Sequence, residues 1–269
     1  MLDTIADGLR ENGVLPLYRY VLTGYVRSTS FLRATYALVT ELKALGAIHI
    51  CDPVMGDEGK LYVPQELVAT YQSMIEGAYM ITPNQFELSL LSNSEVKTKS
   101  DIFQACNALH LRGIKHVVVT STSLAENNQA VSETVVVVEG EEGLQHKQKQ
   151  KQKQMFISVL ASQLLDGAAE GADKIRRYEI RFPELPHHFT GTGDLFASFM
   201  LARHNLYPHE DAFSRNLEWV LNAIQAILRY TMEHRSPRDP QMELNLIGAK
   251  DSILNSQTIF SVMDVTDME

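Results

Sequence analysis

With 269 residues, of which 45% are hydrophobic, the chain is long enough to bury the core of one full domain. A net charge of −9 argues against non-specific binding to nucleic acid, because such binding needs a basic face. Cys51 and Cys106 lie in apolar stretches without metal-type spacing, which indicates free buried thiols and a reducing compartment. No apolar run approaches the roughly 20 residues that span a bilayer, and no secretory signal opens the chain. We therefore expect a soluble, cytoplasmic (cytosolic) protein with neither nucleic-acid nor membrane partners.

Short apolar runs alternate with segments of helical periodicity along most of the chain. We expect strands over residues 20–23, 47–51, 79–81, 116–119, 134–138 and 178–182. We expect helices over residues 2–10, 31–45, 65–76, 84–91, 101–111, 193–204, 209–234 and 241–254. This alternation predicts an α/β fold with a mostly parallel central sheet that is covered by helices on both faces.

Two segments depart from this alternation. Residues 147–154 repeat Lys-Gln without an apolar side chain, so we expect a disordered insertion over residues 141–154. A targeting or nucleic-acid role for the lysines of this repeat is the alternative. The chain also opens on a helical segment, whereas a doubly wound fold usually opens on a strand, which indicates that a front portion is missing.

The most informative motif is Thr190-Gly191-Thr192-Gly193-Asp194, which an apolar helical run follows at once. Backbone N–H groups at a helix N-terminus attract an anion, and the two glycines let the main chain approach it closely. The Asp194 carboxylate would place a base beside a bound phosphate. The alternative interpretation is an ordinary helix start with a carboxylate in its first turn.

Further oxygen-bearing side chains follow the predicted strands. Asp52 and Asp57 come just after the strand over residues 47–51, where an oxygen-rich site for Mg²⁺ or an ordinary Asp-Pro-Gly turn would form. Thr82, Asn84 and Glu87 follow the next strand. Asn84 and Glu87 fit a helix capping box as well as a metal–phosphate cluster.

Three weaker signals stay open between function and structure. Thr120 and Ser121 are either hydroxyls near nucleotide phosphates or a polar strand end. Tyr62 is equally ambiguous, and Tyr25 is either a stacking partner for a flat substrate or a surface aromatic residue.

The combination resembles the ribokinase-like superfamily and, within it, the pyridoxal kinase family. Three segments carry the resemblance: Asp52–Pro64, Ile81–Glu87 and Phe189–Phe196. Residues 21–25 and the tail at residues 241–244 also fit, and the match breaks only around residues 140–177. The family has about two further strands before the position of Met1, including residues that contact pyridoxal.

The resemblance implies a single ribokinase-like kinase domain over residues 1–269, a three-layer αβα sandwich, and roles for individual residues. Asp194 is the implied base, and Gly191, Thr192 and Gly193 are the implied anion hole. The implied cation group comprises Asp52, Asp57, Thr82 and Glu87. The implied ATP contacts are Asp52, Tyr62, Asn84, Gln85, Phe86, Glu87, Thr120, Ser121, Leu185, Pro186, His187 and Thr192. The implied substrate contacts are Tyr25, Gly191 and Asp194.

By the same resemblance the cofactors are ATP, Mg²⁺ or Zn²⁺, and a monovalent cation, K⁺ or Na⁺, and the assembly is a homodimer. The leading hypothesis is ATP-dependent phosphorylation of the hydroxymethyl group of pyridoxal, pyridoxine or pyridoxamine. One alternative is a related kinase of a hydroxymethylpyrimidine or a sugar. Another is a truncated isoform that binds nucleotide or a full-length partner with little turnover.

Overall fold

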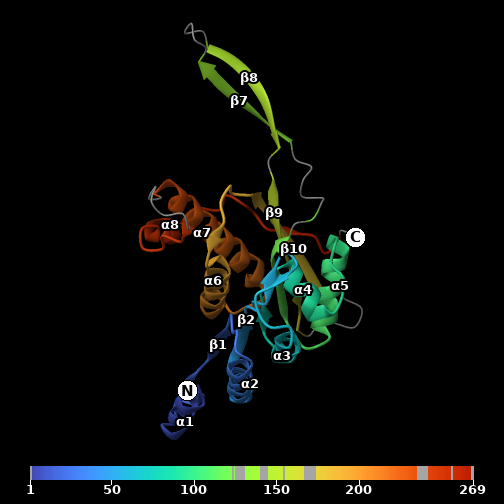
Figure 1. The fold of residues 1–269 in the computed structure, drawn as a ribbon, viewed down its shortest axis with the longest axis vertical. Helices are drawn as coiled ribbons and strands as arrows, with labels where there is room; N and C mark the ends of the chain where they lie inside the picture. Colours follow the sequence, from blue (N-terminus) through green and yellow to red (C-terminus); the bar gives the residue numbers. More distant parts are fainter. Residues whose placement is uncertain are drawn as a thin grey trace.

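The computed structural model describes residues 2–122, 124, 131–139, 145–153, 155–166, 174–234, 242–255 and 257–267. Within these residues the main sheet has seven strands in the order β1-β2-β5-β6-β9-β10-β13 (Figure 1). The pairs from β1 to β6 are parallel, and the pairs from β6 to β13 are antiparallel. As a result β10 points the same way as the first four strands, and only β9 and β13 run against them.

The elements have the following bounds. The strands of the main sheet are β1 (Tyr20–Thr23), β2 (Ile48–Cys51), β5 (Met80–Ile81), β6 (His116–Thr122), β9 (Phe156–Leu164), β10 (Ile175–Pro183) and β13 (Met263–Asp264). The other strands are β3 (Gly56–Asp57), β4 (Lys60–Leu61), β7 (Val131–Glu139), β8 (Gln145–Lys153), β11 (Phe189–Thr190) and β12 (Met242–Glu243). The helices are α1 (Leu2–Glu11), α2 (Thr29–Ala44), α3 (Leu67–Met74), α4 (Gln85–Ser92), α5 (Lys99–His110), α6 (Thr192–Leu206), α7 (Phe213–Glu233) and α8 (Lys250–Leu254).

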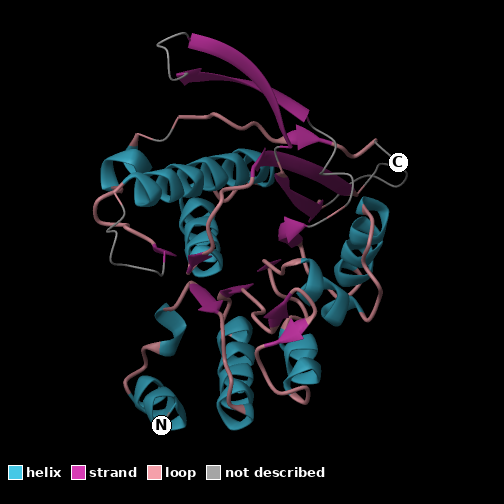
Figure 2. Cartoon of the chain, turned by 45° about the horizontal axis from the view of Figure 1, so that its top comes forward, coloured by secondary structure: helices cyan, strands magenta, loops and turns pink. Residues whose placement is uncertain are grey.

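Helices cover both faces of the sheet (Figures 1 and 2). Successive strand residues point to opposite faces, so Cys51 packs into the core with α3, α4 and α5 while Ile50 packs into the core with α6 and α7. Val117 and Val118 of β6 divide in the same way, and both are completely buried. Two apolar cores on either side of one sheet make a three-layer αβα sandwich, which confirms the predicted fold class.

The predicted strands of the parallel half are confirmed, and β1 has the predicted bounds. The region after residue 155 differs. Strand β9 has no counterpart in the sequence prediction, although six consecutive residues, Val159 among them, are buried there. The predicted helix over 241–254 is wrong: Met242–Glu243 forms β12 beside β11, and α8 spans only Lys250–Leu254. Pairing with β11 satisfies backbone groups that a helix would otherwise have satisfied internally.

The Lys-Gln repeat also differs from the prediction of disorder. Residues 145–153 form β8, which pairs antiparallel with β7 in a separate two-stranded sheet. Figure 1 shows this hairpin projecting beyond the main sheet. A ladder uses backbone N–H and C=O groups, which a Lys-Gln repeat supplies as well as any other sequence, and the valine-rich β7 is a suitable partner. Residues 141–144 and Gln154, which belong to the predicted insertion, lie outside the described residues.

Taken over its described part, the chain has no helix that is both long and apolar enough to cross a membrane. The predicted free cysteines are confirmed, because Cys51 and Cys106 are both buried and unpaired.

Candidate active site

A cleft of about 1450 Å³ opens where β2, β5 and β6 end, and it continues to α6, α7 and the segment after β10. Most of the side chains predicted for the site line it: Asp52, Asp57, Tyr62, Thr82, Asn84, Gln85, Phe86, Glu87, Thr120, Ser121, Leu185, Pro186, His187, Thr192 and Gly193. The carboxyl ends of parallel strands therefore meet at one edge, as expected for an open α/β sheet. Tyr25, Gly191 and Asp194 are not among the lining residues and lie beside the cleft.

Asp52 is the buried acid at the centre of this edge, with 5% of its surface exposed. Thr82 Oγ1 donates to Asp52 Oδ1 at 3.2 Å, which joins the ends of β2 and β5. Burial raises the pKa of Asp52 to about 6; the hydrogen bond from Thr82 opposes the rise, and the nearby Asp194 carboxylate adds to it. The two acids are thus close enough to interact across the site.

Glu87 is a second buried acid, and its carboxylate is engaged by backbone groups. Oε1 accepts from the Met55 N–H at 2.8 Å and the Gly56 N–H at 3.4 Å, and Oε2 accepts from the Asn84 N–H at 2.9 Å. Burial raises the pKa of Glu87 to about 7 in spite of these hydrogen bonds. Glu87 therefore ties the turn after β2 to the start of α4.

The capping box that the sequence left as an alternative is present at α4. Asn84 Oδ1 accepts from the Glu87 N–H at 2.8 Å, and the Glu87 carboxylate accepts from the Asn84 N–H. Asn84 Nδ2 also donates to Gly56 O at 2.8 Å. Gly56 itself admits no side chain, since a β-carbon there would lie 2.1 Å from Lys60 O. The β3–β4 turn, which carries Asp57, is thereby held against the end of β5.

The glycine-rich turn at the start of α6 faces the same acids. Gly191 has φ of 87°, a left-handed conformation that favours glycine, and no described side chain caps the helix there. A β-carbon at Gly193 would lie 3.1 Å from Asp52 Oδ2, and one at Gly24 would lie 3.8 Å from Asp194 Oδ1. The uncapped N-terminus of α6 therefore lies between Asp52 and the loop that follows β1.

That loop carries Tyr25, whose side chain is half exposed. The completely buried Tyr71 of α3 holds it, because the Tyr71 hydroxyl accepts from the Val26 N–H at 3.0 Å and donates to Gly24 O at 3.4 Å. Tyr25 thus follows Gly24, the residue that faces Asp194, and it is not among the residues that line the main cleft.

The other end of the cleft is apolar and was not predicted from the sequence. Its wall consists of Phe156, Ile157, Phe182, Leu221, Ile224 and Leu228, with Gln225 among them. Residues 221, 224, 225 and 228 share one face of α7. The predicted helix over residues 209–234 did not show that part of this face borders a cleft.

No group of three or more His, Cys, Asp and Glu side chains that could hold a metal occurs in the part of the chain that the structure describes. The carboxylates of Asp52 and Asp57, which line the cleft, are ligands of the kind that Mg²⁺ takes together with phosphate oxygens and water.

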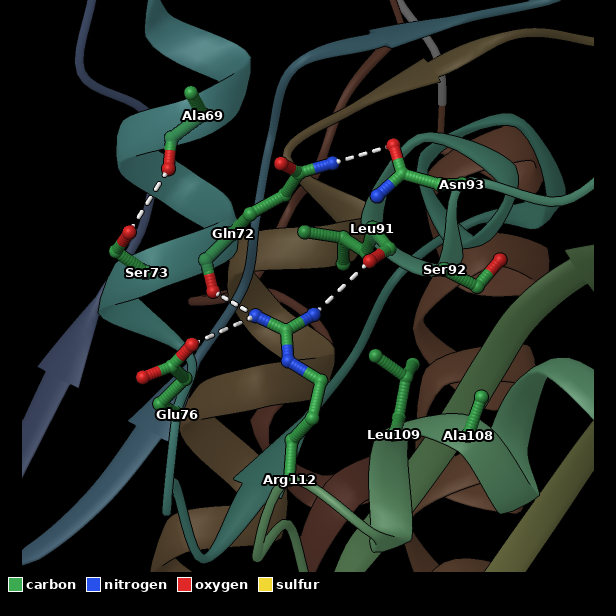
Figure 3. A pocket seen from close by; sticks show the side chains of 10 residues that line it. All are labelled: Ala69, Gln72, Ser73, Glu76, Leu91, Ser92, Asn93, Ala108, Leu109 and Arg112. Carbon is green, nitrogen blue, oxygen red and sulfur yellow. Dashed lines mark hydrogen bonds and ion pairs between the residues drawn. The ribbon is translucent and has the colours of Figure 1, made fainter.

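A smaller pocket of about 390 Å³ lies away from the cleft, between α3, α4 and the end of α5 (Figure 3). Arg112 fills its floor and donates to Gln72 O, to Leu91 O and to the Glu76 carboxylate. These contacts join three helices, so Arg112 serves packing there.

The fold and the cleft together define an α/β enzyme in which a glycine-rich helix start without a described side-chain cap lies beside buried acids. A family model described as phosphomethylpyrimidine kinase matches residues 19–169. A pyridoxal kinase of Arabidopsis thaliana is 33% identical over 94% of this chain and 73% of its own length. The chain belongs to the pyridoxal kinase family.

Solved structures agree with this assignment. Pyridoxal kinase from Leishmania donovani in complex with ADP superimposes with a TM-score of 0.76 at 28% identity, covering 97% of this chain and 80% of that one. The same enzyme in complex with ADP and pyridoxamine has a TM-score of 0.74 at 28% identity, with 97% and 79% covered.

Proposed function

We propose that this protein is a kinase that transfers the γ-phosphoryl group of ATP to the hydroxymethyl group of pyridoxal, pyridoxine or pyridoxamine. The family supports the reaction, and the relative from Leishmania donovani binds ADP and pyridoxamine. The observation that carries the proposal is the close approach of the α6 start to Asp52. A β-carbon added at Gly193 would lie only 3.1 Å from Asp52 Oδ2. A phosphate at that helix start would meet the backbone N–H groups and the acid group together.

We assign Asp194 as the base, because it stands in the first turn of α6 beside the loop that carries Tyr25. It takes the proton from the substrate hydroxyl as that oxygen bonds to the γ-phosphorus and the bond to the β–γ bridging oxygen breaks. The N–H groups of Gly191, Thr192 and Gly193 stabilise the charge on the transferred group. Tyr25 is assigned to the wall of the pyridine site.

The acids at the strand ends fit a Mg²⁺–phosphate group. Asp52 and Asp57 would hold it, and bound Mg²⁺ neutralises phosphate charge during transfer. Thr82 orients Asp52 through its hydrogen bond. Both Glu87 oxygens accept from backbone N–H groups, so we assign Glu87 to fixing the turn that carries Asp57 rather than to direct coordination. A K⁺ or Na⁺ requirement belongs to the same proposal.

The remaining lining residues are assigned to ATP. These residues line the same cleft as the acids and the apolar wall: Tyr62, Asn84, Thr120, Ser121 and the segment 185–187. Gln85 and Phe86 extend this lining along the start of α4.

Purified protein with ATP and Mg²⁺ should form pyridoxal 5′-phosphate, measured by absorbance. Parallel reactions with a hydroxymethylpyrimidine and without an acceptor test the related kinase and nucleotide hydrolysis. Asp57→Ala should raise the Mg²⁺ concentration needed for half-maximal rate. An unchanged Mg²⁺ dependence would overturn the assignment of Asp57, whereas phosphorylation of the pyrimidine alone would overturn the substrate.

The proposal includes a homodimer, a cytosolic location and a single kinase domain. Light scattering coupled to size exclusion tests the first, and a single cooperative unfolding transition tests the last.

A further inference from the structure

Gln225 of α7 is a buried amide in an otherwise apolar part of the cleft. Only 4% of its surface is exposed, and it lines the cleft beside Leu221, Ile224 and Leu228. Its Oε1 atom is buried and accepts no hydrogen bond from any described residue. An amide oxygen left this way costs free energy in the folded protein, and a bound molecule with a donor group would satisfy it.

The two ends of the cleft differ in the chemistry that they can bind. At one end stand Asp52, Asp57 and the start of α6, which suit a Mg²⁺–phosphate group. At the other end Phe156, Phe182 and the α7 side chains form apolar walls, which suit a flat ring. A nucleoside triphosphate therefore fits with its phosphates toward Asp52 and its base against α7.

We propose that Gln225 selects the base of the nucleotide by pairing with adenine, an inference that rests on the proposed kinase function. A side-chain amide presents one acceptor and two donors in a plane. Its acceptor matches the 6-amino group of adenine and its donor matches the ring nitrogen N7, a pairing that glutamine makes with adenine elsewhere. Guanine offers two acceptors at the same edge, so one of the two hydrogen bonds is lost.

The test replaces Gln225 by methionine, which is close in size and lacks the amide. The kcat/KM values of the wild type and Gln225→Met are measured for ATP, GTP and purine riboside triphosphate, which lacks the 6-amino group. We expect the wild type to prefer ATP over purine riboside triphosphate by about tenfold, the effect of one hydrogen bond. Gln225→Met should use the two within about twofold of each other and prefer ATP over GTP less than the wild type does.

Thermal unfolding separates this role from a structural one. Replacing an unpartnered buried amide by an apolar side chain should leave the melting temperature unchanged or higher. Gln104→Leu, on the exposed face of α5, is the surface control and should leave all three nucleotides unaffected. If Gln225→Met does not fold, Gln225→Leu gives the same comparison.

A variant that keeps the wild-type preference for ATP, or that loses activity equally with all three nucleotides, would overturn the role of Gln225. Failure of the proposed function has a different signature, because no nucleotide would then support phosphorylation of pyridoxal by the wild type. Calorimetric binding of the three nucleotides without a vitamer would still test the base preference in that case.

Discussion

The two ends of the parallel strands bury titratable groups in very different settings. At the carboxyl ends, Asp52 and Glu87 are 5% and 3% exposed and border a large cleft. At the amino ends, His49 and His116 are 1% and 2% exposed. His49 Nε2 lies 2.9 Å from the Thr23 hydroxyl, and His116 is stacked on Phe213 at a centroid distance of 4.4 Å. Burial is therefore common to both ends, and only access to a cleft distinguishes the candidate active site.

The two ends also respond to acid in opposite directions. The pKa of Glu87 is raised to about 7 and that of Asp52 to about 6, so the folded protein binds these protons before the unfolded chain does. Protonation of these two carboxyl groups therefore raises the free energy of unfolding as the pH falls through those pKa values. Burial lowers the pKa of His49 to about 4 and that of His116 to about 3, so these groups reduce stability as the pH falls below about 6.5.

The largest effect is expected for Asp194→Asn at the carboxyl end. Removal of a general base commonly lowers kcat by about 10² to 10⁴, while binding of ATP depends on other groups. Turnover is measured by pyridoxal 5′-phosphate absorbance and nucleotide binding by calorimetry. Glu210→Gln, in the short turn between α6 and α7, is the control. Turnover like that of the wild type would remove Asp194 from the proposed mechanism.

Glu87→Ala should destabilise the protein by about 3 kcal/mol, because the Met55, Gly56 and Asn84 N–H groups lose their buried acceptor. Glu87→Gln keeps one acceptor oxygen and should cost about half as much. Urea unfolding at pH 7.5 measures both. A cost below about 0.5 kcal/mol for the alanine variant would show that this carboxylate does not hold the two turns together.

Gly193→Ala tests the narrow space between α6 and Asp52. A β-carbon at 3.1 Å from Asp52 Oδ2 forces a small shift at the site, so kcat/KM should fall by about tenfold. Alanine favours helix more than glycine by about 1 kcal/mol, so stability should not fall. Loss of activity together with a lower melting temperature would contradict this explanation.

The smallest effect is expected at the amino ends. His116→Phe removes a group that the unfolded chain protonates and the folded protein does not, so its stability relative to the wild type should rise as the pH falls. Between pH 6.5 and 5.5 the gain should be on the order of 1 kcal/mol. Urea unfolding at both pH values measures it, with the exposed His209→Phe as control. A difference independent of pH would show that the folded protein and the unfolded chain bind the His116 proton equally, which would contradict the lowered pKa.

Local patterns predicted most of the parallel half. Strand β1 was predicted with its bounds because four β-forming residues stand between breaks, and the capping box of Asn84 and Glu87 was readable from their spacing. The glycine-rich turn at Gly191 was readable for the same reason, since its φ of 87° is a property of a single residue. Signals of this kind lie within a few consecutive residues.

The antiparallel half of the sheet was harder to predict from the sequence. Strand β9 gains its hydrogen bonds from β10, the next strand in the chain, and from β6, which is distant in sequence. Strand β12 forms only because β11 lies beside it. The paired β8 could not be read from a Lys-Gln repeat, because a repeat without apolar residues carries no sign of its partner.

The sequence by itself determined the α/β class, the order of the oxygen-bearing strand ends and the helix start at Gly191, because each depends on neighbouring residues and their conformations. The tertiary structure decided which of these groups meet. It brought Asp52 to the start of α6, gave both oxygens of Glu87 to backbone N–H groups, and turned Gln225 of an apolar helical stripe toward the cleft. Apart from the hydrogen bond between Asn84 and Glu87, which are three positions apart, these contacts join residues that are 30 or more positions apart. Only packing of the helices on the sheet sets the distances of these long-range contacts.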